Sequence, residues 1–114
     1  MSKSPTEYLH HILDEREFLL RESQPITEEQ FMYDEVRQRA FARSLEIIGE
    51  ATKLLPGSFC KKYPNIDWKS FAGLRDKLIH HYFGVDYAIV WDVIKNELPD
   101  FQIQLQKMVS GTEI

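Results

Sequence analysis

Residues 74–82 read Leu-Arg-Asp-Lys-Leu-Ile-His-His-Tyr and contain an arginine, a histidine and a tyrosine at the spacing Arg-x4-His-x-Tyr. Apolar residues around them recur at intervals of three and four, which predicts a helix that starts after Asp67 and includes the whole motif; they are Trp68, Phe71, Leu74, Leu78 and Ile79. At about 100° per residue, Arg75 falls in the middle of this apolar stripe. Burying an unpaired guanidinium is prohibitive, so Arg75 needs a carboxylate, a phosphate or water in a cleft.

The same helical geometry places the other motif residues. Tyr82 returns to within about 20° of Arg75, whereas His80 lies about 140° away, one turn after Asp76. Asp76 and His80 can then pair as carboxylate and imidazole, which would fix the ring's tautomer and raise the pKa of His80. Gly84 is expected to end this helix in a left-handed conformation. One ideal helix does not aim Arg75 and His80 at one point, so either its last turn bends or a second copy of the chain supplies half of the site.

Several classes of enzyme site are missing from the sequence. There is no glycine-rich phosphate loop, no Gly-x-Ser-x-Gly elbow and no His-Glu-x-x-His. The adjacent His80 and His81 would point about 100° apart on a helix, so we expect no metal site and no cofactor.

Metal-free RNA cleavage fits the residues that remain. A histidine with a pKa near neutrality can take the proton of a ribose 2′-hydroxyl, and a guanidinium can stabilise the charge that develops on the phosphate. We therefore predict Arg75, His80 and Tyr82 as catalytic residues, with no cleavage of DNA. Each has a structural alternative: Arg75 as an interface ion pair, His80 as a capping or surface residue, and Tyr82 as core.

The length, charge and cysteine content indicate how many domains the chain forms and where in the cell it is located. We expect residues 1–114 to form one domain, and no apolar run is long enough for a membrane span or a signal sequence. The single cysteine, Cys60, suits a reducing, cytoplasmic location. Net charge is −4, yet residues 53–77 hold six basic and two acidic residues, a local excess of +4. This basic stretch is either a solvated loop or a rim that attracts phosphate.

The remaining patterns predict an all-α fold, an antiparallel bundle of four to five helices. We expect a first helix from Pro5 to about Glu22, with a helical stripe of Leu9, Ile12, Leu13, Arg16 and Leu19/Leu20. A second should run from Thr27 to about Leu55, perhaps kinked near Asp34. Asp86 should cap a helix that ends near Asn96, and Pro99 should open a last one. No stretch alternates as a strand.

The predicted second helix is apolar on two sides. One stripe is Phe41, Leu45, Ile48 and Leu55, and the other is Val36, Ala40, Ile47 and Leu54. A helix of this kind is usually sandwiched, so the second stripe is a candidate dimer face. Glu50 lies beside that stripe and is a candidate partner for Arg75; alternatively, Glu50 is an exposed residue paired with Arg43 or Lys53.

The motif and its surroundings resemble the HEPN ribonucleases, specifically the HepT-like toxins. The resemblance covers about Phe41 to Pro99 in order and includes Ile48-Gly49-Glu50-Ala51, Tyr63-Pro64, Trp68, Tyr82-Phe83-Gly84-Val85-Asp86, Trp91 and Leu98-Pro99. It departs from the family at His81, where the family often has an acidic or small residue, which leaves open which histidine transfers the proton.

This resemblance implies a homodimer in which the motifs of two copies line one cleft. It also implies an MntA-type nucleotidyltransferase antitoxin that transfers AMP to the motif tyrosine, here Tyr82, and so blocks the ribonuclease. Asp76 and Glu50 would be supporting residues. The competing hypothesis is a catalytically inactive HEPN subunit that binds a nucleotidyltransferase, which the acidic net charge favours.

Overall fold

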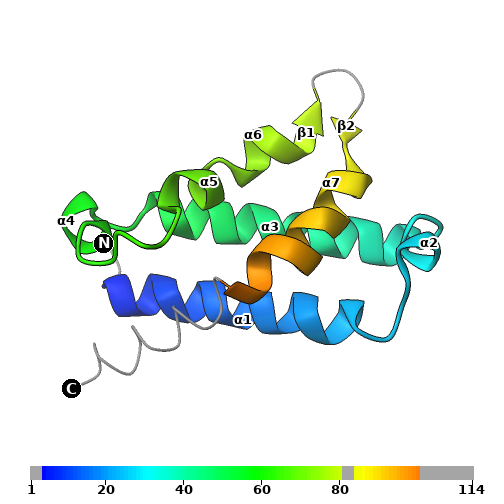
Figure 1. Cartoon of the computed structure of the whole chain (residues 1–114), viewed down its shortest axis with the longest axis horizontal. Helices are drawn as coiled ribbons and strands as arrows, with labels where there is room; N and C mark the ends of the chain where they lie inside the picture. The colour runs from blue at the N-terminus through cyan, green and yellow to red at the C-terminus, as the bar shows by residue number, and fades with distance from the viewer. Residues whose placement is uncertain (1–3, 81–83, 101–114) are drawn as a thin grey trace.

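The computed structural model describes residues 4–80 and 84–100, and the regular secondary structure of this part of the chain is helical apart from one two-residue β-ladder (Figure 1). The helices are α1 Pro5–Ser23, α2 Glu28–Phe31, α3 Glu35–Lys53, α4 Gly57–Cys60, α5 Trp68–Ala72, α6 Leu74–Leu78, α7 Tyr87–Asp92 and the π-helix η1 Val93–Glu97. The strands are β1 Ile79–His80 and β2 Gly84–Val85. The all-α prediction is confirmed. Among the described residues, no helix is long and apolar enough to cross a membrane.

The two 19-residue helices α1 and α3 lie side by side and antiparallel, and they form the base on which the other elements pack (Figure 1). The predicted start of α1 is confirmed: Ser4 Oγ accepts a hydrogen bond from the Glu7 N–H at 3.3 Å. The predicted second helix is instead two helices. Thr27 and Gln30 form a capping box on α2, and Asp34 then caps α3 by accepting from the Arg37 N–H.

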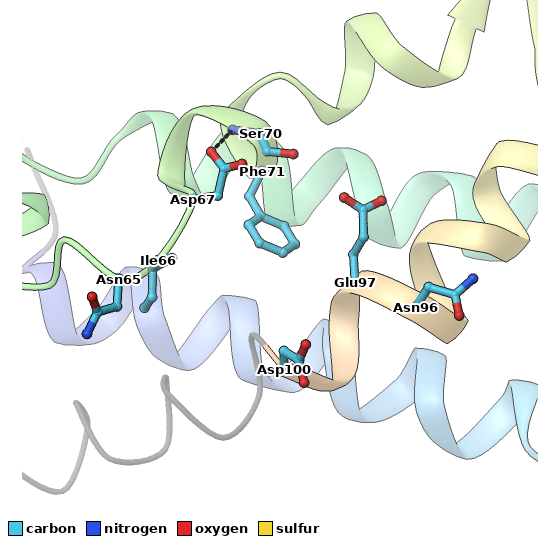
Figure 2. Close-up of a pocket in the computed structure, with 8 residues that line it drawn as sticks. All are labelled: Asn65, Ile66, Asp67, Ser70, Phe71, Asn96, Glu97 and Asp100. Atoms are coloured by element: carbon cyan, nitrogen blue, oxygen red, sulfur yellow. Dashed lines mark hydrogen bonds between the residues drawn. The ribbon is translucent and has the colours of Figure 1, made fainter.

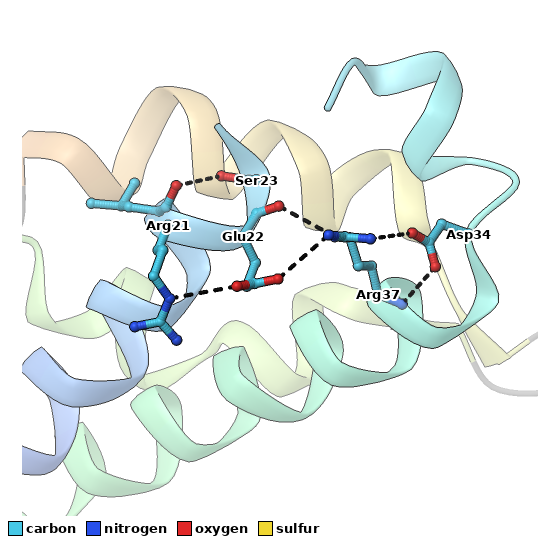
Figure 3. A network of polar contacts seen from close by, with 6 residues as sticks. Arg21, Glu22, Ser23, Asp34 and Arg37 are labelled. Carbon is cyan, nitrogen blue, oxygen red and sulfur yellow. Dashed lines mark hydrogen bonds and ion pairs between the residues drawn. The ribbon is translucent and has the colours of Figure 1, made fainter. Parts of the chain in front are cut away.

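A polar network fixes the turn between α1 and α3 (Figure 3). Arg37 donates to Asp34 Oδ2 at 2.8 Å, to the Glu22 carbonyl at 3.3 Å and to Glu22 Oε1 at 3.4 Å. Hydrogen bonds from the backbone and then the side chain of Arg37 hold the pKa of Asp34 below its usual value. Arg37 therefore joins the end of α1 to the start of α3.

The core lies between α1, α3 and the later helices and is rich in aromatic side chains. The Phe31 ring stacks on Phe41 and also contacts Trp91, with centroids 5.2 Å apart in both pairs. Arg16 occupies a core position on α1, where it is 2% exposed and its Nε and Nη1 groups have no hydrogen-bond partner among the described residues. Burial lowers the pKa of Arg16 to about 10.

The predicted break before Pro99 is absent, because the helix that starts at α7 continues through η1 to residue 100. The Leu98 N–H bonds to the Val93 carbonyl, five residues back, which widens the helix just before Pro99. Proline has no N–H to donate and its ring clashes with a normal α-helical carbonyl, so a π-turn at this point lets the chain continue.

Candidate functional site

The motif segment is not one continuous helix, contrary to the prediction. It consists of α5, a break at Gly73, α6, and the antiparallel ladder of β1 with β2. Ile79 pairs with Val85 and His80 with Gly84, and the Asp86 N–H donates to the Leu78 carbonyl at 2.7 Å. The expectation that no strand forms is therefore wrong at this one ladder. It is two residues long, too short for an alternating pattern.

Gly49 on α3 explains why the junction of α5 and α6 lies where it does. A Cβ at this position would be 3.2 Å from the Phe71 carbonyl oxygen and 3.6 Å from Leu74 Cβ. An alanine at this position would require the α5 backbone to shift by a few tenths of an ångström, so glycine favours this close approach of α3 and α5. Gly49 on α3 therefore lies next to the segment that leads into the motif, although the two are far apart in the sequence.

The break at Gly73 gives Arg75 a different environment from the one predicted. Leu74 and Leu78 are buried and anchor α6 on the core, whereas Arg75, Asp76 and Lys77 between them are exposed. Arg75 was predicted to lie in the middle of the apolar stripe, and this is wrong because the stripe does not continue as one helix past Gly73. Its guanidinium forms no ion pair within residues 4–80 and 84–100.

Two predicted partnerships change as a consequence. Asp76 and His80 are not one helical turn apart, because the chain is extended at His80. Glu50 is exposed on α3 and contacts Lys53 at 3.9 Å, so it is not the intrachain partner of Arg75, and the alternative left open for it is correct. Gly84 has the predicted left-handed conformation, with φ of 75°, but at the start of β2 instead of a helix end.

The remaining predicted site residues, Tyr82 and His81, lie outside the described residues, as does the side chain of His80. The structure fixes what surrounds them on both sides: α6 and β1 before, β2 and the Asp86 cap after. The segments on either side of residues 81–83 are therefore attached to the core by Leu78 and by the cap of α7.

An ion pair that the spacing did not predict ties this segment to the opposite side of the fold. Lys77 Nζ donates to Glu97 Oε2 at 3.1 Å, joining α6 to η1. The two residues are separated by 20 positions, so no local pattern could have indicated the pair.

A cavity of about 310 Å³ lies nearby, between the start of α5 and the end of η1 (Figure 2). Three carboxylates, those of Asp67, Glu97 and Asp100, are among its lining side chains. Neither Arg75 nor Asp76 lines it. The carboxylates of this cavity would repel a phosphate, so the candidate phosphate site is the exposed surface of α6 instead. Within the described residues, no group of three or more His, Cys, Asp or Glu side chains could hold a metal ion.

Basic residues extend from this surface along one edge of the molecule. Lys61, Lys62 and Lys69 are exposed on the segment that leads through α4 and α5 to α6 (Figure 1). None of the three forms an ion pair with another described residue. Both readings of this basic stretch, solvated loop and phosphate-attracting rim, are compatible with that exposure.

Comparison with known proteins decides the family. The sequence model of the family described as Ribonuclease HepT-like matches residues 8–108. The chain belongs to the HepT-like ribonuclease family. The resemblance inferred from the motif is thereby confirmed, and the match runs from Tyr8, within α1, through η1.

Relatives of this HepT-like chain match it over nearly their full length. It is 50% identical to "Putative RNase TTE0752" of Caldanaerobacter subterraneus subsp. tengcongensis over 107 residues, 94% of this chain and 96% of the relative. It is 42% identical to "Putative RNase MJ0127" of Methanocaldococcus jannaschii, covering 93% and 88%. It is 39% identical to "Probable ribonuclease HepT" of Thermococcus cleftensis, covering 95% and 98%. No solved structure matches.

Proposed function

We propose that this HepT-like chain is a metal-independent endoribonuclease toxin whose cleft is completed by a second copy of the chain. The observation that carries the proposal is the state of Arg75, which is exposed and forms no ion pair within the described residues although buried leucines flank it. A structural arginine would be paired inside the fold. A guanidinium held on an anchored helix and open to solvent is instead suited to an external phosphate.

The proposed reaction uses one RNA strand as its own nucleophile. His80 takes the proton of a 2′-hydroxyl, the 2′-oxygen bonds to the adjacent phosphorus, and the bond to the 5′-oxygen breaks. The departing oxygen is protonated, which leaves a 2′,3′-cyclic phosphate and a 5′-hydroxyl. Arg75 binds the phosphate oxygens as charge develops, and Tyr82 offers its hydroxyl to the same phosphate. DNA lacks the nucleophile and is not cut.

We further propose that Arg75 of one copy and His80 of the other act on the same phosphate. The chain leaves helical geometry at β1, directly after α6, so the separation of about 140° that an ideal helix would impose on Arg75 and His80 does not apply. The support for a phosphate shared between copies is the HepT-like resemblance, which implies a homodimer whose two motifs line one cleft. A dimer with both motif segments on one edge would bring the two groups together.

The test is cleavage of a short RNA in the presence of EDTA. Wild type should cut it and leave a cyclic phosphate, whereas His80→Ala should be at least about 100-fold slower, the typical contribution of a general base. An RNA with a single 2′-deoxy substitution at the cleaved position should be resistant. Full cleavage by His80→Ala, or cleavage at the 2′-deoxy position, contradicts the mechanism.

The proposed regulation is the addition of AMP to Tyr82 by an MntA-like nucleotidyltransferase antitoxin. The tyrosine oxygen would bond to the α-phosphorus of ATP and pyrophosphate would leave. The added phosphate would compete with RNA for Arg75, which gives a physical reason for inhibition. Intact mass after co-expression with such a transferase should show AMP-sized increments that are lost in Tyr82→Phe. Increments that persist in this variant place the modification elsewhere.

The second candidate is a catalytically inactive subunit that binds a nucleotidyltransferase, and the net charge of −4 favours it. Expression in bacteria separates the two candidates. The toxin should arrest growth and His80→Ala should not, provided that the variant is folded. Equal arrest by both proteins favours the inactive subunit.

A further inference from the structure

The segment between α3 and α6, which carries α4 and α5, is fixed to the core although much of its surface is exposed. Phe59, Ile66 and Phe71 are buried. Trp68 Nε1 donates to the Tyr63 carbonyl at 3.0 Å, and the Phe59 ring contacts the Tyr63 and Trp68 rings with centroids 5.2 Å and 6.3 Å away. The segment is therefore a fixed support for the side chains on its surface and not a loosely attached loop.

Three lysines on this segment carry charges that no ion pair within the described part of the chain neutralises. Lys61, Lys62 and Lys69 are exposed, and none pairs with a described carboxylate. Lys77 on α6, by contrast, is paired with Glu97 at 3.1 Å. Like charges on one short segment repel each other. Their concentration here, in a chain with a net charge of −4, therefore indicates an anionic partner.

The acidic cavity and the lysines lie on different sides of α5. Asp67 is the only acidic residue in residues 54–74. Its carboxylate accepts a hydrogen bond from the Ser70 N–H at 3.1 Å and lines the cavity (Figure 2). Lys69 is about 100° around α5 from Ser70 and about 160° from Phe71, and both of those residues line the cavity. The surface that carries Lys69 is therefore basic, separate from the carboxylates that would repel a phosphate.

The surface with the lysines leads to Arg75. Figure 1 shows α4, α5 and α6 one after another along the length of the molecule, with β1 beyond them. Arg75 is exposed on α6 and also lacks an ion pair within the described residues. An RNA strand carries one negative charge per nucleotide, so a strand with one phosphate at Arg75 has further phosphates on both sides of it. One of these two directions follows the lysines.

We propose that Lys61, Lys62 and Lys69, called here the lysine edge, bind phosphates of the RNA on one side of the cleaved bond. The substrate is then a strand that extends several nucleotides beyond that bond, and not a minimal dinucleotide. Lysine contacts a phosphate as a point charge, and contacts to the backbone fix the position of a strand without reading its sequence. The inference rests on the proposed function for the role of Arg75, but binding to the lysine edge can be measured without cleavage.

The binding test uses a 20-nucleotide RNA in which every 2′-hydroxyl is methylated, so that no internal nucleophile is available, and measures fluorescence anisotropy. Changing Lys61, Lys62 and Lys69 together to Gln should raise the Kd roughly 100-fold at 0.1 M salt. The difference should shrink towards 1 M salt, because each lysine on a single strand contributes about 0.7 to the salt slope. The same three changes to Arg keep the charge and should preserve binding. Arg21→Gln with Arg39→Gln, at exposed arginines that are paired within the chain, should change the Kd less than about twofold.

The length of the substrate supplies a second readout. In the triple Gln variant, cleavage of a 20-nucleotide RNA should show a higher KM with an unchanged kcat, the result of losing uniform binding. Cleavage of a dinucleotide should be the same as in wild type, because a dinucleotide does not reach the lysine edge. A purely structural role of the lysines would slow the cleavage of both substrates. Melting temperatures establish that the variants are folded.

The outcomes separate this inference from the proposed function. Weak binding by wild type, wild-type binding by the triple Gln variant, or an equal loss in the Arg21 and Arg39 control each overturns the lysine edge, whatever the cleavage assay shows. Wild-type binding by the triple Gln variant is the result expected if this surface serves an acidic protein instead. The expected binding pattern together with an absence of cleavage leaves the lysine edge intact and rejects the nuclease.

Discussion

Arg16 on α1 and Arg75 on α6 each lie in an apolar stripe at helical spacing in the sequence, and the fold gives them opposite environments. Arg16 is 2% exposed, and two of its N–H groups lack acceptors among the described residues, because α1 is an unbroken helix of 19 residues. Arg75 is exposed because the break at Gly73 ends the regular stripe. The difference teaches that the continuity of the helix matters more than the local composition. It decides whether such an arginine is buried and lowers the stability of the fold, or is exposed and can bind a ligand.

The largest expected effect concerns activity at Arg75. Arg75→Ala should slow RNA cleavage by at least about 100-fold, since it removes the group that stabilises the developing phosphate charge. The free energy of unfolding should change by less than about 0.5 kcal/mol, as for other exposed positions. Arg21→Ala, at another exposed arginine, is the matched control and should retain activity. An unfolded Arg75→Ala protein would mean that Arg75 has a structural role like that of a core residue.

The opposite result is expected at Arg16. Arg16→Met keeps the apolar stem and removes the buried N–H groups, so it should raise the free energy of unfolding by about 1–2 kcal/mol. Urea denaturation measures this change, and the rate of RNA cleavage should stay the same. A loss of stability would show that the Arg16 guanidinium has a favourable partner.

The pH dependence of that stability difference follows from the pKa of Arg16, which burial lowers from its ordinary value to about 10. Below pH 10 the group is charged in both the folded and the unfolded states, so the folded state bears the full cost of burying the charge. Above pH 10 the folded state releases its proton first and the cost falls. The stability gap between wild type and Arg16→Met should therefore be constant below pH 10 and narrow above it; a gap that widens there contradicts this assignment.

A smaller effect is expected where α3 supports the Arg75 segment. In Gly49→Ala, the added Cβ would lie 3.2 Å from the Phe71 carbonyl oxygen and displace the junction of α5 and α6. The gain in helix propensity, about 1 kcal/mol, should offset most of the resulting strain. We expect little change in stability but a decrease in cleavage of about tenfold, since small misplacements of catalytic groups are costly. Unchanged cleavage would show that this contact does not position Arg75.

The smallest effect is expected at the ion pair next to Arg75. Lys77→Met removes the 3.1 Å contact with Glu97, in which both side chains are partly exposed. Such pairs contribute little, so thermal unfolding should show a loss of no more than about 0.5 kcal/mol. A loss of several kcal/mol would mean that Lys77, and not Leu74 and Leu78, anchors α6.

Local signals in the sequence predicted much of the fold and less of the site. The helix starts at Pro5 and after Asp67 and the cap at Asp86 depend on residues within one turn, and all three occur as predicted. The break at Gly73 was not predicted, because its cause includes a contact with Gly49, 24 positions earlier on another helix. The continuation of the helix through Pro99 was missed as well, because a π-turn leaves no periodic signal.

The spacing of Arg75, His80 and Tyr82 identified the family even though the helical geometry assumed for it was wrong. The types and spacing of these residues were enough to indicate the family, whereas the arrangement of the motif in space depends on the junction between α6 and β1. The sequence likewise offered three possible partners for Glu50, namely Arg75, Arg43 and Lys53, and the structure pairs it with Lys53.

The most direct test of the central claim mixes two inactive proteins, Arg75→Ala and His80→Ala. If each cleft uses Arg75 of one copy and His80 of the other, half of the dimers in a random equimolar mixture contain one intact cleft of two. RNA cleavage should then return to about a quarter of the wild-type rate. A mixture whose dimers exchange subunits, as native mass measurement can verify, but which stays as inactive as either variant alone would contradict a cleft shared between copies.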